Sequence, residues 1–340
     1  MTTPFPGARW WKFDLHTHTP ASIDYGKGPN QAALGAVTPE DWLLGFMRAG
    51  IDCVAVTDHN TGEWIDRLKA ALSQIEAAPH PGYKPLHLFP GVEITASGGV
   101  HVLAILDRIK AATEIAQLLG AVRFSVTRGA SDAAADYSVI QVIQEIRRAG
   151  GIPILAHVDG PSGAFKVLNG NTLAPLLDAP ELFAVEVCDS ASARPALYTQ
   201  KKLAWAEVLG SDAHHPTGQP GARYPGSHYT WIKMGEPSIE GLRLALLDGN
   251  EFSVRRSDKT VAGFDPNQAP ENWIESIEIR DARYMGRGEP EKLAFSPFMN
   301  ALVGGRGTGK STVVHFARAA LSRIDEIEKM EGTSEPRRAF

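Results

Sequence analysis

Cysteine is scarce in this sequence, with two residues in 340. Both Cys53 and Cys188 lie inside apolar segments (IDCVAV and AVEVC), where cysteine is expected to be a small buried residue. A disulfide framework is therefore not expected, and neither is a structural zinc site, which would favour thiolate ligands.

Long apolar runs are also missing. No segment approaches the roughly 18 consecutive apolar residues of a membrane-spanning helix. The amino-terminal stretch MTTPFPGARWWKFDLH lacks the basic-then-apolar order of a secretory signal peptide. These two absences predict a cytoplasmic protein without a membrane partner.

Basic charge is not in excess. The sequence has 39 acidic residues against 34 lysines and arginines, and its formal net charge is −5. The bulk charge therefore gives no support for sequence-independent binding to nucleic acid. It does not exclude nucleic acid either, because a local basic rim is hidden in the sum and acidic metal ligands lower the total.

Short apolar runs alternate with amphipathic stretches over most of the chain. This alternation predicts parallel strands joined by helical crossovers, hence a sheet or barrel of the α/β class. The expected strands are Ile51–Thr57, Leu86–Ile94, Val100–Leu106, Ile152–Ala156, Phe183–Val187, Val208–Gly210 and His228–Met234. The expected helices are 38–50, Glu63–Ala77, Thr113–Leu119, Tyr137–Ala149, Ala191–Ala204 and Ser238–Leu247.

The composition changes near residue 256. The stretch Ser257–Pro270 (SDKTVAGFDPNQAP) is polar and rich in proline and glycine, which is typical of a linker. Two further strands are expected at Trp273–Tyr284 and Lys292–Val303. We therefore predict a first domain over residues 1–255, a linker over 256–271 and a second, shorter region over 272–340.

Histidines and acidic residues recur where the expected strands end. His16 and His18 are two residues apart, so both point to one side of an extended chain. The carboxyl ends of strands converge on one face of a βα barrel, so these residues are expected to meet in a small volume. The candidate ligands are His16, His18, Asp24, His59, Glu93, His101, His157, Asp212 and His214.

Any one of these residues has an ordinary structural interpretation, as a surface side chain or a helix cap. Their joint occurrence at successive strand ends favours a metal site instead. Ligation by histidine and carboxylate without thiolate suits two or three divalent ions of manganese, zinc or iron.

The motifs HxH, TDH, GxE with a following histidine, AH and GSDxH resemble those of the polymerase-and-histidinol-phosphatase (PHP) phosphoesterases, over residues 13 to about 250. The resemblance implies a distorted (βα)7 barrel and hydrolysis of a phosphoester by a metal-activated water. It implies a first metal on His16, His18, Glu93 and Asp212, a second on Glu93, His101 and His157, and a third on Asp24, His59 and His214.

Three further residues are candidates for roles around the metals. Asp58, next to His59, is expected to accept a hydrogen bond that orients a ligand rather than to act as the general base. Arg123 and Arg223 lie in loops, and arginine matches the geometry of a phosphate. A solvated loop arginine is the alternative for each.

The segment Gly304–Ser311 (GGRGTGKS) satisfies the phosphate-binding loop pattern GxxxxGK[ST]. It follows the apolar run Met299–Val303 and precedes an expected helix, Thr312–Leu321. In such a loop Gly304, Gly305, Gly307 and Gly309 let backbone amides face the phosphates of ATP, Lys310 reaches the β and γ oxygens, and Ser311 holds Mg²⁺.

The surrounding region resembles the opening of ABC-type ATPases related to the chromosome-maintenance and DNA-repair proteins. About 29 residues follow Ser311 and contain no second acidic segment, so the region is expected to be the beginning of an ATPase domain that does not turn over ATP. The rest of such a domain, or a second protomer, is an expected partner.

Three functions are compatible with the sequence. The first is a metal-dependent phosphoesterase acting on nucleotides, DNA or RNA and coupled to the ATP-binding module. The second is a nucleotide-sensing scaffold with a structural barrel. The third is a small-molecule phosphatase of the histidinol-phosphate type. The complete ligand set favours an enzyme over a scaffold.

Overall fold

The computed structural model describes residues 7–79, 81–218, 223–283 and 285–323. The chain divides into two compact units, one of which is Ala8–Phe264, while the other contains the residues from Asp265 onward. The division falls inside the predicted linker. The first linker residues form the 3-10 turn η1 (Ser257–Lys259) and belong to the larger unit, because Ser257 N donates to Tyr229 O at 2.9 Å.

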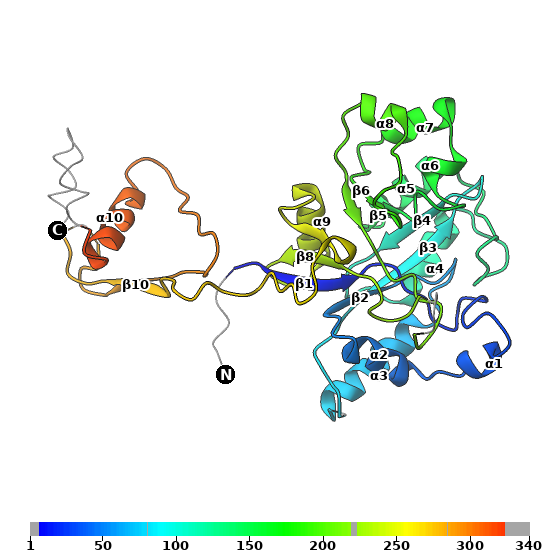
Figure 1. Ribbon diagram of the computed structural model, residues 1–340, viewed down its shortest axis with the longest axis horizontal. Helices are drawn as coiled ribbons and strands as arrows, with labels where there is room; N and C mark the ends of the chain where they lie inside the picture. Colours follow the sequence, from blue (N-terminus) through cyan, green and yellow to red (C-terminus); the bar gives the residue numbers. More distant parts are fainter. Residues whose placement is uncertain (1–6, 80, 219–222, 284, 324–340) are drawn as a thin grey trace. The chain divides into compact units, whose positions relative to one another are not determined.

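A nine-stranded mixed sheet forms the frame of the larger unit (Figure 1), in the order β7-β6-β5-β4-β3-β2-β1-β8-β9. Its two edges approach each other, because Glu207 N in β7 donates to Oδ1 of Asn250, just before β9, at 2.9 Å. The sheet is therefore a nearly closed barrel. Its strands are β1 (Arg9–Asp14), β2 (Cys53–Val56), β3 (His87–Thr95), β4 (His101–Ile105), β5 (Ile152–Leu155), β6 (Ala184–Glu186), β7 (Ala206–Val208), β8 (Thr230–Met234) and β9 (Val254–Arg256).

The prediction of parallel strands throughout the sheet is wrong at two strands. β4 runs antiparallel to β3 and to β5, and β8 runs antiparallel to β1 and β9. The connection between β3 and β4 spans only residues 96–100, whereas a parallel crossover needs a dozen or more. β1 and β9 are not among the strands expected from the sequence, and β7 begins two residues earlier than the expected Val208–Gly210.

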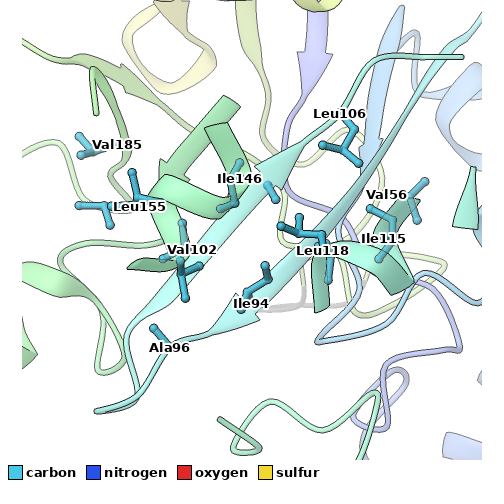
Figure 2. Close-up of a cluster of buried hydrophobic side chains, with 14 of the residues drawn as sticks. Val56, Ile94, Ala96, Val102, Leu106, Ile115, Leu118, Ile146, Leu155 and Val185 are labelled. Atoms are coloured by element: carbon cyan, nitrogen blue, oxygen red, sulfur yellow. The ribbon is translucent and has the colours of Figure 1, made fainter. Parts of the chain in front are cut away.

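Apolar side chains fill both faces of the sheet. On the outer face, Ile94 and Val102 from strands pack with Leu118 and Ile146 from helices (Figure 2). Inside the barrel, strand residues alternate with these, and helix α9 adds Leu242 to the inner core. The helices of the larger unit are α1 (Gln31–Leu34), α2 (Pro39–Arg48), α3 (Ile65–Ala77), α4 (Ala112–Ala121), α5 (Val139–Arg148), α6 (Ala164–Val167), α7 (Gly170–Leu177), α8 (Ala196–Gln200) and α9 (Ile239–Asp248).

Most expected helices form, but Ala191–Ala204 shrinks to the five residues of α8. Pro195 is the N-cap of α8 with an extended backbone, and Lys202, beyond its end, has a left-handed φ of 53°. Neither conformation continues a helix. Cys53 is buried as expected, whereas Cys188 is only half-buried.

The smaller unit contains a hairpin and one helix. Strands β10 (Ser276–Ile279) and β11 (Glu291–Ala294) pair antiparallel, and α10 (Lys310–Ala320) follows the glycine-rich loop. Tyr284, the last residue of the expected strand 273–284, lies outside the described residues. The expected strand Lys292–Val303 forms only at its start, as β11. Its end, Met299–Val303, has no strand partner among the described residues, and Val303 is 93% exposed.

None of the helices in the described ranges is both long enough and apolar enough to cross a bilayer.

Candidate metal centre

All nine predicted ligands converge at one end of the barrel. Seven of them follow the carboxyl ends of β1, β2, β5 and β7, whereas Glu93 lies within β3 near its end and His101 is the first residue of β4. Because β4 is antiparallel to its neighbours, its first residue, His101, lies at the same end as the last residues of β3. The reversed strand therefore still delivers its histidine to the cluster.

The first predicted group is closely packed. His16 Nε2 lies 3.1 Å from His18 Nε2, 3.3 Å from Glu93 Oε2 and 3.5 Å from Asp212 Oδ1. His18 Nε2 lies 3.5 Å from Glu93 Oε2 and 3.2 Å from Asp212 Oδ1. Donor atoms bound to one ion at about 2.0–2.1 Å lie about 2.9–3.4 Å apart in octahedral or tetrahedral geometry. The four donor atoms thus have close to the spacing of a metal site.

The second and third predicted groups are also assembled. Glu93 Oε1 lies 2.8 Å from His101 Nδ1 and 3.0 Å from His157 Nε2. Asp24 places one carboxylate oxygen 3.4 Å from His59 Nε2 and the other 3.4 Å from His214 Nε2. The two histidine nitrogens are 3.3 Å apart.

Glu93 joins the groups. Its Oε1 faces His101 and His157, whereas its Oε2 faces the first group and also lies 2.8 Å from His59 Nδ1. The carboxylate is fully buried, with 0% of the residue exposed. One carboxylate in contact with three groups of donors is the arrangement of a bridging ligand.

Hydrogen bonds on the far side of the rings fix where the histidine protons lie. His16 Nδ1 donates to Glu186 Oε2 at 2.7 Å, and His214 Nδ1 donates to the carbonyl of Asp212 at 3.0 Å. His101 Nε2 donates to the Ser131 carbonyl at 3.1 Å. These acceptors have no proton to give, so each neutral ring carries a lone pair on its other nitrogen.

Those lone pairs point at carboxylate oxygens, which are also acceptors. His101 Nδ1 and Glu93 Oε1 are 2.8 Å apart, a distance that needs a cation or a proton between them. Buried Asp24 Oδ1 and Glu93 Oε2 have no hydrogen-bond donor among the described residues. Protonating every ring would instead pack several positive charges together, since the His18 and His214 rings stack at 3.8 Å. The donor set therefore fits divalent metal ions.

The electrostatics of the metal-free cluster differ from ring to ring. Against the effect of burial, Glu93 and Asp24 raise the pKa of His59 to about 9, and Asp212 and Asp24 raise the pKa of His214 to about 10, so a metal bound there displaces protons. Burial and the nearby His214 and His59 hold the pKa of His18 well below its ordinary value, so that ring is neutral. Burial alone would raise the pKa of Glu93, but His16 and His59 hold it well below its ordinary range. The carboxylate is therefore ionised, as a metal ligand must be.

Two ligands have left-handed backbones, which cost energy for residues other than glycine. φ is 27° at His157 and 51° at Asp212. His16 O accepts a hydrogen bond from Asp212 N at 2.7 Å, which holds the second of these turns. Such strain persists where the surrounding structure enforces it, and it is frequent at functional sites.

Asp58 lies behind the cluster. Its carboxylate accepts hydrogen bonds from the amide and hydroxyl of Thr19 at 2.7 Å and from Ser22 Oγ at 2.8 Å. Ser22 Oγ in turn accepts from His18 Nδ1 at 2.9 Å. Burial raises the pKa of Asp58 to about 6. Asp58 thus contacts a ligand through Ser22, which is the geometry of an orienting residue and not of a general base.

The two candidate arginines differ in position. Arg223 Nη1 lies 3.9 Å from Asp212 Oδ2, and its side chain is about one-third exposed. Arg123 is exposed, with its guanidinium 5.4 Å from the centre of the Tyr137 ring, and within the described chain no ion pair joins it to a ligand. The structure brings Arg223 to the centre and does not bring Arg123 there.

Accessibility is uneven across the cluster. The side chains of His16, His18 and Glu93 are 0% exposed, whereas those of Asp24, Asp212 and His214 are 25–29% exposed. A solute therefore reaches the centre from the side of Asp24, His214 and Asp212, and Arg223 lies next to Asp212.

Two buried acids in contact with the ligands are missing from the predicted set. Glu186 ends β6 and bonds His16, and Asp14 ends β1 and accepts from Ser211 N at 2.8 Å. Burial raises the pKa of Asp14 to about 7. Glu186 lies near the end of the expected strand Phe183–Val187, so its signal was present in the sequence, whereas no expected strand precedes Asp14.

No protein family model matches the sequence. No curated protein matches it either.

Solved structures do resemble the chain. The lesion-specific endonuclease PfuEndoQ from Pyrococcus furiosus aligns with a TM-score of 0.52 at 16% identity, over 72% of this chain and 58% of that one. Endonuclease Q in complex with a 27-mer duplex substrate with an abasic lesion aligns at 0.49 and 15% identity, over 72% and 58%. A two-domain protein from Bacteroides vulgatus containing a predicted PHP-like metal-dependent phosphoesterase aligns at 0.43 and 18%, over 75% and 67%.

The chain thus spans a little over half of PfuEndoQ, with an α/β barrel fold like that of this endonuclease.

Proposed function

We propose that this chain is a metal-dependent phosphoesterase that hydrolyses phosphodiester bonds in nucleic acid. The observation that carries the proposal is the set of histidine lone pairs and carboxylate oxygens that face one another at 2.8–3.5 Å at the open end of the barrel. The fold shared with PfuEndoQ supports the same chemistry, as an analogy between folds.

Different side chains would hold each of the three metals. His16, His18, Glu93 and Asp212 would hold one metal, and Glu93 would share its second oxygen with His101 and His157. Asp24, His59 and His214 would hold a third near the solvent. When bound, divalent metals at such a site supply Lewis acidity and activate water for attack on phosphorus.

Arg223 is the residue we assign to the substrate. Its guanidinium lies beside Asp212 on the accessible side, where it can bind a phosphate oxygen and orient the ester. Asp58 would keep His18 in place through Ser22. Neither side chain needs to act as a nucleophile.

Nucleic acid is the substrate class we favour over a small phosphomonoester. PfuEndoQ is described as a lesion-specific endonuclease, and a related complex contains a DNA duplex with an abasic lesion at the active site. A site whose ligands are reached from an open side also admits a polymer more readily than an enclosed pocket does.

A substrate panel tests the proposal. Purified protein loaded with Mn²⁺ is incubated with p-nitrophenyl phosphate, bis-p-nitrophenyl phosphate, nucleotides, and single- and double-stranded DNA and RNA, including a duplex with an abasic site. We expect turnover of the diesters and of DNA. Turnover of monoesters alone would favour the small-molecule phosphatase, and no turnover with full metal occupancy would favour a structural barrel.

Replacing Arg223 with alanine should weaken substrate binding more than it affects the metals. One charge-assisted hydrogen bond contributes about 1.5–3 kcal/mol, so we expect kcat/KM to fall by about 10- to 150-fold. Metal content should stay the same. Steady-state kinetics and elemental analysis check this, with Arg123→Ala as the matched control. An Arg223→Ala enzyme with unchanged kcat/KM would remove Arg223 from the site.

We further propose that Gly304–Ser311 binds a nucleoside triphosphate weakly. Gly307 and Gly309 have left-handed φ angles of 83° and 85°, and α10 begins at Lys310. Lys310 Nζ now donates to the carbonyls of Gly304 and Gly305 at 2.7 and 2.6 Å. A phosphate would have to displace these bonds, and no described acidic strand stands ready to complete a Mg²⁺ site.

The chain by itself should therefore not turn over ATP, and Lys310→Ala should weaken binding of a fluorescent ATP analogue. Fluorescence anisotropy and a phosphate-release assay measure the two effects. ATP turnover that disappears in Lys310→Ala would mean that the ATPase site is complete, for example through a second protomer.

A further inference from the structure

Glu186 is a buried acid outside the candidate ligand set that contacts two of its members, His16 and His157. It is the last residue of β6, and 1% of it is exposed. Its Oε2 accepts from His16 Nδ1 at 2.7 Å and from the backbone amide of His157 at 3.0 Å. Its Oε1 accepts from the backbone amide of Gly210 at 3.1 Å.

We infer that Glu186 is a positioning residue for the first two metal groups. It holds His16 and the turn that carries Asp212 in the first group, and His157 in the second. This inference rests on the proposed function, since it assigns a role within the same metal centre. Glu186 itself does not reach the open side of the cluster.

The contact with His16 decides which nitrogen of this ring can bind metal. The carboxylate of Glu186 accepts a hydrogen bond from Nδ1–H of His16. The lone pair of the neutral ring therefore lies on Nε2, which faces Glu93, Asp212 and His18. A carboxylate that accepts a hydrogen bond from the far nitrogen of a metal-binding histidine fixes the ring in this way and increases its basicity.

The two amide contacts hold strained turns. His157, with φ of 27°, donates its own amide to Glu186. Gly210 begins the turn that leads to Asp212, whose φ is 51°. The turn has no room to shift, because a Cβ at Gly210 would lie 2.6 Å from His16 Cβ and 3.0 Å from Glu186 Oε1.

Glutamine cannot replace Glu186, although it has the same size. The carboxylate accepts from three N–H donors through two oxygens. In one amide orientation of glutamine, its NH₂ group faces the Gly210 amide. In the other, it faces both His16 Nδ1 and the His157 amide. Either orientation sets donor against donor, or forces His16 to give up the lone pair on Nε2.

The test measures metal binding directly. Glu186→Gln is titrated with Mn²⁺ by calorimetry, and its bound metal is counted by elemental analysis after dialysis. Loss of an outer-shell partner typically weakens metal affinity by about 10- to 100-fold. We expect this loss for the two groups that Glu186 touches, whereas the group of Asp24, His59 and His214 should keep its metal.

Glu207→Gln is the matched control. Glu207 lies on the adjacent strand β7 and pairs with Arg194 at 2.7 Å rather than with a ligand. It should bind metal as the unsubstituted chain does. Glu186→Asp keeps the charge but is one methylene shorter, so it should restore part of the affinity. Circular dichroism of the chelated proteins shows whether each variant is folded.

The outcomes are distinct. Selective loss of two metals in folded Glu186→Gln supports the inference. Unchanged stoichiometry and affinity in this variant, with metal bound normally by the unsubstituted chain, overturns it and leaves the proposed function intact. An unsubstituted chain that binds no divalent metal overturns the proposed function itself. Should Glu186→Gln not fold, Glu186→Asp with unchanged affinity for all metals would also overturn the inference.

Discussion

Replacing Glu93 with glutamine should reduce phosphoesterase turnover by more than about a hundredfold, since outer-shell changes alone cost about 10- to 100-fold. Glu93 contacts members of all three groups, through Oε1 to His101 and His157 and through Oε2 to His16, His18 and His59. A neutral amide keeps the shape but removes the bridging charge and one acceptor oxygen. We expect the variant to lose bound metal, and its turnover to fall as a consequence of that loss.

Kinetics on bis-p-nitrophenyl phosphate and elemental analysis of the same samples check this expectation, with Glu207→Gln as the control of equal chemistry. If folded Glu93→Gln retained its metals and near-native turnover, the assignment of a bridging carboxylate would be wrong. Full metal content with turnover lost would instead place Glu93 in the chemistry and not in binding.

The convergence of the candidate ligands could be predicted from the sequence because the signal lies in their joint occurrence and not in any single residue. Histidines and acids follow successive apolar runs, and barrel topology brings strand ends together whatever the loops between them do. The prediction tolerated a mistake in topology. Parallel strands were expected throughout, yet His101 reaches the cluster because an antiparallel β4 begins where β3 ends.

Supporting residues could not be ranked in the same way. Glu186 follows the apolar run that forms β6, just as Glu93 lies within β3, but the sequence does not show which acids face the metals and which face the backs of the rings. That distinction depends on side-chain direction at a strand end and on the turns at His157 and Asp212. Left-handed backbones at a histidine and an aspartate are set by the surrounding hydrogen bonds, and local sequence does not specify them.

The local sequence pattern also fails to predict secondary structure where the outcome depends on a neighbouring strand or on a single proline. Met299–Val303 is apolar enough for a strand, but a strand needs a neighbour, and the described residues supply none for it. Likewise, Ala191–Ala204 has a helical composition, while Pro195 confines the helix to five residues. In both cases the composition of the segment favours the expected element, but the neighbouring residues do not allow it to form.

Removal of metal should lower the melting temperature of the protein as well as abolish its activity. Without cations, the buried carboxylate of Glu93 and the partly buried carboxylate of Asp212 face histidine lone pairs, and only proton uptake can offset the repulsion. A ligand that binds only the folded state stabilises it by about 4.1 kcal/mol when its free concentration is 1,000 times Kd. At about 2–4 °C per kcal/mol for a domain of 150–250 residues, the expected decrease is about 8–16 °C.

Calorimetric melting of the protein with and without EDTA measures this decrease, and re-addition of Mn²⁺ should reverse it. The same comparison on Glu93→Gln separates metal binding from a general effect of the chelator, because a variant that holds less metal has less stability to lose. We therefore expect EDTA to shift the variant by only a small part of the native shift. An equal shift in both proteins, or no shift in the native protein loaded with metal, would mean that the nine side chains do not form a metal centre that stabilises the fold.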